Sequence, residues 1–416
     1  MAGIHRERPG ADAMAGATGE PIDLGDGIVQ SSGWSNSYLV RTDDGRVVIN
    51  TGMGFEGPLH RRAYDAVDAS PVRAVILTQG HYDHVGGIDV VRDPDSEVIA
   101  QANFTMWRED NERLEAFRSR NSAFAFIDAI LAAMDHAGEL GVGQVAQGRP
   151  EPTRTVADRL ELVVGGRRLE LIATPGGETF DSMVVWLPDE RTLFSGNLFG
   201  PLFGHVPNLV TIRGDRYRDA LTYVRSLDVV LELSPERLIT GHFDPIEGAD
   251  RIAEETVALQ EAMRSVHDQT VDGMNAGRDV WSLMRDVAVP AHLDVGEGYG
   301  QTSWNVRAVW ETYAGWFHHR STTELYGVHP LATAPDVVAA AGAAALVAAA
   351  RAHLAAGRAV EALQLTDLVL AAEPGDAGAL DVALTAHRAL AAGTGNFWES
   401  AWLRRAATKL EERATP

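Results

Sequence analysis

Hydrophobic and polar positions change their period several times along the chain. Over residues 23–50, short runs rich in β-branched residues are separated by turn residues, which predicts a strand, a second strand, a turn and a third strand. A helix over 59–69 and a strand over 74–79 follow, and then a helical stretch between about 100 and 150. Strands resume after that stretch, with a hairpin turn at 188–190. Strands and helices that recur across two halves predict an α/β fold of paired sheets with helices outside.

The last third of the chain is almost wholly helical in pattern, beginning with a long segment over 249–277. After Pro335, a helix, turn, helix and turn resemble tetratricopeptide-type hairpins, although the repeats are too few for a full solenoid. Such an array usually buries its open face, so a second copy of the chain is the expected cover. The N-terminal residues are small and polar without periodicity. We therefore expect a disordered tail over 1–20, an α/β domain over 21–248 and a helical domain over 249–416.

Composition excludes several classes of partner and site. A formal net charge of −22 opposes binding to nucleic acids and to anionic membranes. No apolar run approaches the roughly 20 residues that span a bilayer, and the N-terminus lacks the continuous apolar core of a secretory signal, so a cytoplasmic location is expected. The chain has no cysteine, which excludes disulfides and sulfur-ligated metals. Any metal must bind His, Asp, Glu, amide oxygen or water.

The most specific motif is TQGHYDHVGG at residues 78–87, which crowds His81, Asp83 and His84 into four positions. It follows a predicted strand, and we expect it to be a loop, because a loop can bring the three side chains together whereas a helix would spread them. Imidazoles and a carboxylate are ligands for zinc, manganese or iron. Alone, the motif is equally typical of a polar surface loop.

Three distant positions repeat the pattern of a polar residue at a strand end. Glu178 lies in TPGGETFDSM, Asn197 in LFSGN and His242 in ITGH. Each of them alone is more typical of a structural role, but their succession favours one shared site. The predicted metal ligands are His81, Asp83, His84, Glu178 and His242.

These motifs permit comparison with a known family. NSYLVRTDDGRVVINTG, TQGHYDHVGG, TPGGE, LFSGN and ITGH resemble the successive motifs of the metallo-β-lactamase superfamily over about residues 23–248. Glu178 after TPG, where most members have His, resembles the alkylsulfatase-like branch. NLVTIRGDRYRDA resembles the alkylsulfatase stretch that carries a sulfate-binding arginine, here Arg213. GYGQTSWNVRAVWETYAGWF resembles another alkylsulfatase segment, which implies that Tyr299 and Asn305 approach the substrate anion.

The resemblance implies an αββα metallo-β-lactamase sandwich followed by an all-α dimerisation domain, and hence a homodimer. It implies a metal-dependent hydrolase in which metal-bound hydroxide attacks an ester or activated ether bond. The family's C-terminal sterol-carrier-like domain is expected to be lacking, because the chain stops after the helical segment. A small anionic or aromatic substrate is therefore favoured over a long-chain alkyl sulfate. The candidate catalytic residues are Asp83, Glu178, Gln79 and Asn197.

The sequence departs from the family at three positions. The family binds two metals, one through the first two histidines of HxHxDH and the glutamate, the other through the aspartate, the last histidine and the distant histidine, with a bridging carboxylate. Here Gln79 replaces the first histidine, Asn197 the bridging carboxylate and Asn50 the acid of the I-D-T-G strand end. We therefore predict one tightly bound divalent ion, zinc before iron or manganese, and a second site that is weak or absent. The ligands of the tight site are Asp83, His84 and His242.

Two further interpretations stay open. Two histidines and one carboxylate around open positions also form the facial triad of mononuclear non-haem iron oxygenases. Alternatively, the three neutralising replacements indicate a catalytically altered subunit that supports an active paralogue in a hetero-oligomer. The metal content and the consumption of oxygen distinguish the first alternative from hydrolysis.

Overall fold

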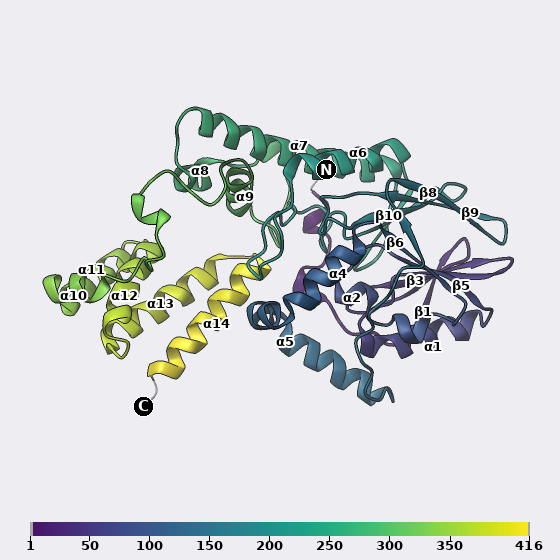
Figure 1. Ribbon diagram of the computed structural model, residues 1–416, viewed down its shortest axis with the longest axis horizontal. Coiled ribbons are helices and arrows are strands. Elements are labelled where there is room, and N and C mark those ends of the chain that lie inside the picture. The colour runs from purple at the N-terminus through teal and green to yellow at the C-terminus, as the bar shows by residue number, and fades with distance from the viewer. Residues whose placement is uncertain (1–2, 415–416) are drawn as a thin grey trace. The chain divides into compact units, whose positions relative to one another are not determined.

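The computed structural model describes residues 3–414 of the chain (Figure 1). The chain divides into two compact units, Met1–Tyr313 and Ala314–Pro416, each of which is described by itself.

Two sheets form the centre of the first unit. The seven-stranded sheet has the order β1-β2-β3-β4-β5-β6-β7, with bounds Pro21–Gly25, Ile28–Ser31, Ser37–Thr42, Gly45–Ile49, Val72–Leu77, Glu97–Gln101 and Arg154–Val156. The six-stranded sheet has the order β13-β12-β11-β10-β9-β8, and the bounds of β8 to β13 are Arg159–Val164, Arg167–Ala173, Met183–Leu187, Thr192–Gly196, Arg237–Thr240 and Ile246–Glu247. The predicted hairpin is confirmed by the antiparallel pairing of β10 with β11.

Helices surround and connect these strands. The α-helices of the first unit are α1 Gly57–Val67, α2 Tyr82–Val85, α3 Ile88–Val91, α4 Phe104–Arg113, α5 Glu115–Glu139, α6 Ala220–Leu233, α7 Ala249–Asn275, α8 Val280–Asp286 and α9 Thr302–Ala314, the last of which ends one residue beyond the unit boundary. Short 3-10 helices occur at Ile4–Arg6, Ala11–Ala13, Gly54–Glu56 and Ala291–Leu293.

Alternating side chains of the strands divide the apolar interior into three layers. Val40 and Val47 of the first sheet belong to one cluster with Leu171 and Val185 of the second sheet, so this cluster lies between the sheets. The opposite faces pack against helices: Tyr64 of α1 covers the first sheet, and α6 and α7 cover the second. Figure 1 shows α6 and α7 along one outer side and α1 along the other. The αββα sandwich is confirmed.

Residues 3–20 differ from the disordered tail that their composition predicts. Ile4 is buried and belongs to the core cluster of α6 and α7. The backbone N–H groups of Gly3 and Ile4 donate to carboxylate oxygens of Asp294 and Glu255, each at 2.8 Å. Hydrogen bonds to Asp294 and Glu255 thus order an N-terminal segment whose own sequence shows no regular hydrophobic pattern. Residues 1–2 of the predicted tail lie outside the described part of the chain.

The second unit is helical, as predicted. Its helices are α10 Ala334–Ala341, α11 Ala343–Ala355, α12 Ala359–Ala372, α13 Ala377–Gly393 and α14 Phe397–Ala414, with a 3-10 helix at Thr322–Leu325. Successive helices from α11 to α14 pack against one another around a small-residue core that includes Ala350, Ala362 and Ala379. Within residues 3–414 no single helix is long and apolar enough to cross a membrane. Among these residues, α10 and α11 taken together have the required length and composition, but the pair is bent by 93°.

The boundary between the units falls at Tyr313, later than the expected division after residue 248. The reason is α7, whose buried Ile252, Leu259 and Met263 share a core cluster with strands of the second sheet. A helical pattern alone therefore did not mark the start of the second unit.

Candidate metal centre

Four loops meet where parallel strands end. β4 pairs in parallel with β5, and β11 with β12. Asn50 follows β4, His81 follows β5, Asn197 follows β11 and His242 follows β12. Carboxyl ends of parallel strands lie at one edge of a sheet, so Asn50 and His81 lie at one edge of the first sheet, and Asn197 and His242 at one edge of the second. The contact between His242 and Asp83 joins the two edges. The predicted arrangement of polar residues at strand ends is therefore present in the fold.

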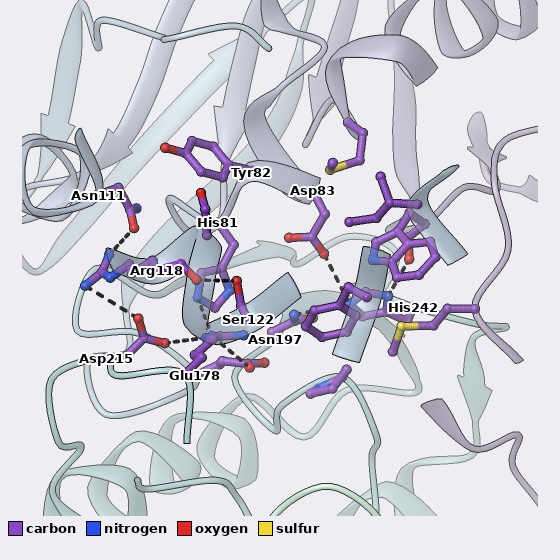
Figure 2. Close-up of a pocket in the computed structure, with 18 of the residues that line it drawn as sticks. His81, Tyr82, Asp83, Asn111, Arg118, Ser122, Glu178, Asn197, Asp215 and His242 are labelled. Carbon is purple, nitrogen blue, oxygen red and sulfur yellow. Dashed lines mark hydrogen bonds and ion pairs between the residues drawn. The ribbon is translucent and has the colours of Figure 1, made fainter. Parts of the chain in front are cut away.

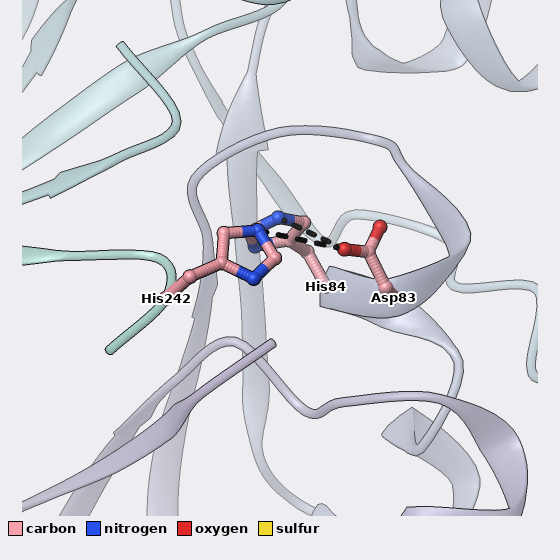
Figure 3. A group of neighbouring side chains, drawn as sticks. All are labelled: Asp83, His84 and His242. Carbon is pink, nitrogen blue, oxygen red and sulfur yellow. Dashed lines mark ion pairs between the residues drawn. The ribbon is translucent and has the colours of Figure 1, made fainter. Parts of the chain in front are cut away.

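Asp83, His84 and His242 form one cluster, in which three ligand atoms lie within 4.8 Å of one another (Figure 3). Asp83 Oδ2 is 3.6 Å from His84 Nε2 and 3.8 Å from His242 Nε2. The two imidazole rings are perpendicular, with centroids 5.7 Å apart. Burial lowers the pKa of His84 to about 3 and that of His242 to about 4, so both rings are neutral at pH 7, as a ligand must be.

The segment that carries this cluster is not wholly a loop. Tyr82–Val85 forms the single helical turn α2, and His81 precedes it with an extended backbone. The expectation that a loop brings His81, Asp83 and His84 together is wrong in this respect. The turn keeps Asp83 and His84 beside His242, whereas His81 has other partners.

His242 is oriented for ligation through Nε2. Its Nδ1 lies 2.8 Å from the Trp34 carbonyl oxygen, an acceptor that requires the proton on Nδ1. The Trp34 backbone N–H donates to Glu56 Oε1 at 2.7 Å, and Glu56 also accepts from Ala17 and Met53. A buried carboxylate thus fixes the backbone that orients the histidine.

Asn50 favours the opposite tautomer in His84 from the one that Trp34 favours in His242. Asn50 Oδ1 accepts from the Thr78 backbone N–H at 2.9 Å, which leaves Nδ2 facing His84 Nδ1 at 3.0 Å. An amide N–H donates, so this orientation favours the tautomer of His84 that has its proton on Nε2. His84 Nε2 is buried and has no hydrogen-bond partner among residues 3–414.

His81 and Glu178 lie outside the three-residue cluster. His81 Nε2 is 3.0 Å from Arg213 Nη2, and His81 Nδ1 is 2.9 Å from Gln79 Nε2. Glu178 Oε1 is 3.8 Å from Arg213 Nη2. Burial raises the pKa of Glu178, against the opposing effect of nearby Arg218 and Arg213. The five predicted ligands therefore separate into a group of three and a pair that flanks a guanidinium.

An ionic network fixes that guanidinium. Arg213 Nε donates to Asp215 Oδ2 at 2.7 Å, and Asp215 lies 3.5 Å from both Arg118 and Arg218. Burial alone would raise the pKa of Asp215, but Arg213 and Arg218 outweigh burial, and the pKa falls well below its usual range. Asp215 is therefore a carboxylate at any physiological pH.

Asp83 and His242 of the three-residue cluster, and His81 and Glu178, line one cavity of about 250 Å³. In Figure 2, Asp83 and His242 lie toward one end of the cavity, and His81, Glu178, Asp215 and Arg118 lie toward the other. Asn197 also lines the cavity, and its Nδ2 is 3.2 Å from His242 Nε2. The apolar part of the wall consists of Met14, Trp34, Met53, Trp107, Phe126, Ile130 and Pro201.

Of the three predicted substrate-binding residues, Arg213 and Tyr299 line the cavity, whereas Asn305 does not. Asn305 is fully buried, and its amide accepts from the Leu209 N–H and donates to the Pro207 carbonyl. The structure thus places Asn305 beneath the loop that leads to Arg213. Gln79 is also fully buried and is not among the residues that line the cavity, but its side chain contacts His81, which does line it.

Some residues of the site carried no signal in the sequence. Asp215 and Arg118 are ordinary charged residues in their local patterns, and Arg118 lies on α5, far in sequence from every motif. Arg118 lies 5.2 Å above the Trp107 ring, and that ring packs edge-on against His81. The RGDR sequence around Asp215 was the only available hint, and it indicated the arginine alone.

The cluster of three suits a divalent cation. Two neutral imidazoles and a carboxylate are a complete ligand set for a catalytic metal with open positions, and the carboxylate faces both rings. His84 Nε2 is buried without a hydrogen-bond partner in the described part of the chain, which also suits a metal ion at this position. Two features oppose metal binding. The Asn50 amide favours the less suitable tautomer of His84, and Asn197 Nδ2 lies 3.2 Å from His242 Nε2, the nitrogen that would bind the metal.

Comparison with known proteins agrees with this architecture. The model of the metallo-beta-lactamase superfamily matches residues 33–242, and the model of alkyl sulfatase dimerisation matches residues 283–413. A linear primary-alkylsulfatase from Pseudomonas sp. is 26% identical over 301 residues, which cover 67% of this chain and 56% of that protein. The alkyl/aryl-sulfatase BDS1 of Saccharomyces cerevisiae is 27% identical over 267 residues, which cover 59% of this chain and 41% of that protein. The chain spans about half the length of these relatives.

The structure of the stereoselective inverting sec-alkylsulfatase Pisa1 from Pseudomonas sp. superposes with a TM-score of 0.83 at 21% identity. The match covers 95% of this chain and 66% of that one, so the two share a fold over both units. The superfamily match takes in half of the chain and each strand-end residue of the centre. The chain therefore belongs to the metallo-beta-lactamase superfamily and carries an alkyl sulfatase dimerisation domain.

Proposed function

We propose that this protein is a metal-dependent hydrolase of small anionic esters, with sulfate monoesters as the first substrate class. The observation that carries the proposal is that Asp83 and His242 of the three-residue cluster line the same cavity as Arg213. Guanidinium groups suit sulfate because their planar donors match two oxygens at once. The names of the alkylsulfatase relatives support the same class.

Asp83, His84 and His242 would hold one divalent ion, with zinc proposed first. A divalent ion in such a site supplies Lewis acidity and lowers the pKa of water to about 7. Asp83 contributes the charge, and the Trp34 carbonyl keeps His242 in the tautomer that presents Nε2.

Glu178 and Tyr299 are the proposed groups for proton movement and orientation. Glu178 lines the cavity, and burial raises its pKa, which favours the protonated form that can donate a proton. Tyr299 lines the same cavity and lies within electrostatic reach of Arg213 and Glu178. Phe126 and Ile130 provide an apolar wall for an aryl or short alkyl group. The small cavity favours such a substrate over a long chain.

A mononuclear non-haem iron oxygenase is the second candidate. The cluster consists of two histidines and one carboxylate, which is the donor set of that class. Arginine side chains in the cavity would serve an anionic substrate in either reaction, so the identity of the metal and the use of oxygen must decide between them.

The test begins with elemental analysis of protein purified without added metal. Hydrolysis of 4-nitrophenyl sulfate and of short alkyl sulfates is then measured before and after chelation, with zinc added back under nitrogen. We expect anaerobic release of sulfate that depends on zinc. Asp83→Asn should abolish it, because the substitution removes the only carboxylate of the cluster. Asp89→Asn, on the exposed face of α3, is the matched control and should retain it. Bound iron with consumption of oxygen would instead favour the oxygenase.

A further inference from the structure

His81 and Glu178, the two predicted ligands outside the three-residue cluster, both lie beside the guanidinium group of Arg213. Arg213 Nη2 lies 3.0 Å from His81 Nε2 and 3.8 Å from Glu178 Oε1. A guanidinium has only donors, so His81 Nε2 must accept a hydrogen bond from it. The lone pair that would bind a metal ion at this position is therefore engaged by the side chain of Arg213.

The tautomer of His81 agrees with this assignment. With Nε2 accepting from Arg213, the single proton of the neutral ring must be on Nδ1. Nδ1–H needs an acceptor, whereas the structure places the Gln79 amide nitrogen, Nε2, 2.9 Å away. Gln79 Oε1 is buried and has no partner among residues 3–414. A half-turn of the amide group would bring Oε1 to Nδ1, and this is the orientation that the tautomer of His81 requires. Gln79 then orients His81 toward the guanidinium and contributes no ligand of its own to a metal.

Asp215 prevents the guanidinium from moving away. It accepts from Arg213 Nε at 2.7 Å, and its side chain is 3% exposed. The Arg213 side chain is itself 14% exposed, so a dication entering between His81 and Glu178 would meet a fixed positive charge with little water to screen it. Asp215 also lies near Arg118 and Arg218, so it keeps two cationic partners when Arg213 is replaced.

We infer that Arg213 is a built-in cation that takes the place of a second metal ion between His81 and Glu178. The centre then binds one divalent ion, at Asp83, His84 and His242, and the opposite end of the cavity is held positive by the protein itself. This inference rests on the metal centre of the proposed function and specifies its stoichiometry. It also assigns Gln79 as a positioning residue that acts through His81.

The experiment counts bound zinc by native mass spectrometry and records the absorption spectrum of cobalt-substituted protein. Wild type should bind one equivalent. Arg213→Met combined with Gln79→His removes the guanidinium and supplies an imidazole, and it should bind two equivalents. Arg213→Lys retains the charge and should bind one. Arg216→Met is the matched control, because Arg216 is half exposed and pairs with Asp110, which retains Arg113, so it should also bind one.

The outcomes separate this inference from the proposed function. Two equivalents in wild type, with hydrolysis intact, would overturn the inference and leave the hydrolase standing. A double variant that has the circular dichroism of wild type and still binds one equivalent would overturn it as well. Wild type that binds no divalent ion and hydrolyses nothing would overturn the proposed function, and the inference with it.

Discussion

At the scale of single residues, one amide decides how well His84 can bind a metal. Asn50 has a left-handed backbone conformation, with φ of 60°, and its Oδ1 is committed to the Thr78 N–H. Its Nδ2 therefore faces His84 Nδ1 and favours the proton on Nε2. The metal must displace that proton before His84 can bind it, which lowers the affinity of the centre.

Replacing this amide by a carboxylate should strengthen the centre. In Asn50→Asp, one carboxylate can accept from both the Thr78 N–H and His84 Nδ1–H, which frees Nε2. We expect the dissociation constant for zinc to fall by about 10–100-fold, as measured by competition with a chromophoric chelator. Asn275→Asp, at the exposed end of α7, makes the same change of charge and should leave the constant unchanged. Equal effects of the two substitutions would contradict the role of Asn50.

His60 gives a prediction for stability against pH. It is fully buried beside Ser31, and burial lowers its pKa to about 3, whereas an unfolded histidine has a pKa of about 6.5. The unfolded chain binds more protons between these values, so the free energy of unfolding decreases as the pH falls below 6.5. Because of this residue, the free energy of unfolding should be about 2 kcal/mol lower at pH 5 than at pH 7.

His60→Gln removes that dependence. In urea titrations of chelated protein, the variant should lose about 2 kcal/mol less than wild type between pH 7 and pH 5. The comparison uses the difference between the two pH values, so any constant loss of packing cancels. Parallel curves for the two proteins would show that His60 does not carry the effect.

At the scale of elements, the centre depends on loops that approach without side chains between them. Gly241 follows β12, and a Cβ there would lie 2.3 Å from Asn197 Oδ1 and 2.8 Å from His84 Cε1. Its N–H donates to Gly196 and its carbonyl accepts from Asn36, so the backbone has little freedom to withdraw. Only a glycine lets His84 and His242 approach each other here.

Gly241→Ala should therefore weaken metal binding while the fold persists. We expect about a tenfold loss of zinc affinity, since overpacking of this kind costs about 1–3 kcal/mol. Gly138→Ala on α5 is the matched control, because a Cβ there meets nothing within 4 Å, and it should leave the affinity unchanged. Titration calorimetry of both variants, with circular dichroism to verify folding, provides the measurement. Unchanged affinity in Gly241→Ala would contradict the importance of this approach.

At the scale of the whole molecule, the C-terminal part of the chain is the basis for predicting self-association. Residues 283–413 match a family named for alkyl sulfatase dimerisation, and the helical unit exposes large apolar side chains, including Val360 and Trp402, at 55% and 51%. Exposed apolar residues of this size often mark an interface. We predict that the full chain is a homodimer, with twice the chain mass of 44.8 kDa in light scattering after gel filtration. A monomer mass at micromolar concentration would contradict this prediction.

The positions of polar residues after predicted strands indicated much of the metal centre. They did not indicate that His81 and Glu178 lie apart from the other three predicted ligands. A polar residue directly after a buried strand is visible in the sequence, and it correctly indicated that Asp83, His84 and His242 converge. Whether His81 joins them depends on the helical turn of α2 and on Arg213, more than a hundred residues away. Asn305 resembled a substrate ligand by its motif, yet the packing of α9 commits its amide to loop backbone.

By itself, the sequence determined the two architectures, the order of their elements and the types of ligand available, because period, turn residues and composition are local properties. Tertiary structure decided the pairing of His81 with Arg213, the tautomer that Asn50 favours and the unit to which α7 belongs. Each of these depends on distances between side chains that are remote in the chain. The physical reason is that hydrogen bonds and charges act over a few ångströms, and only folding sets which groups come that close.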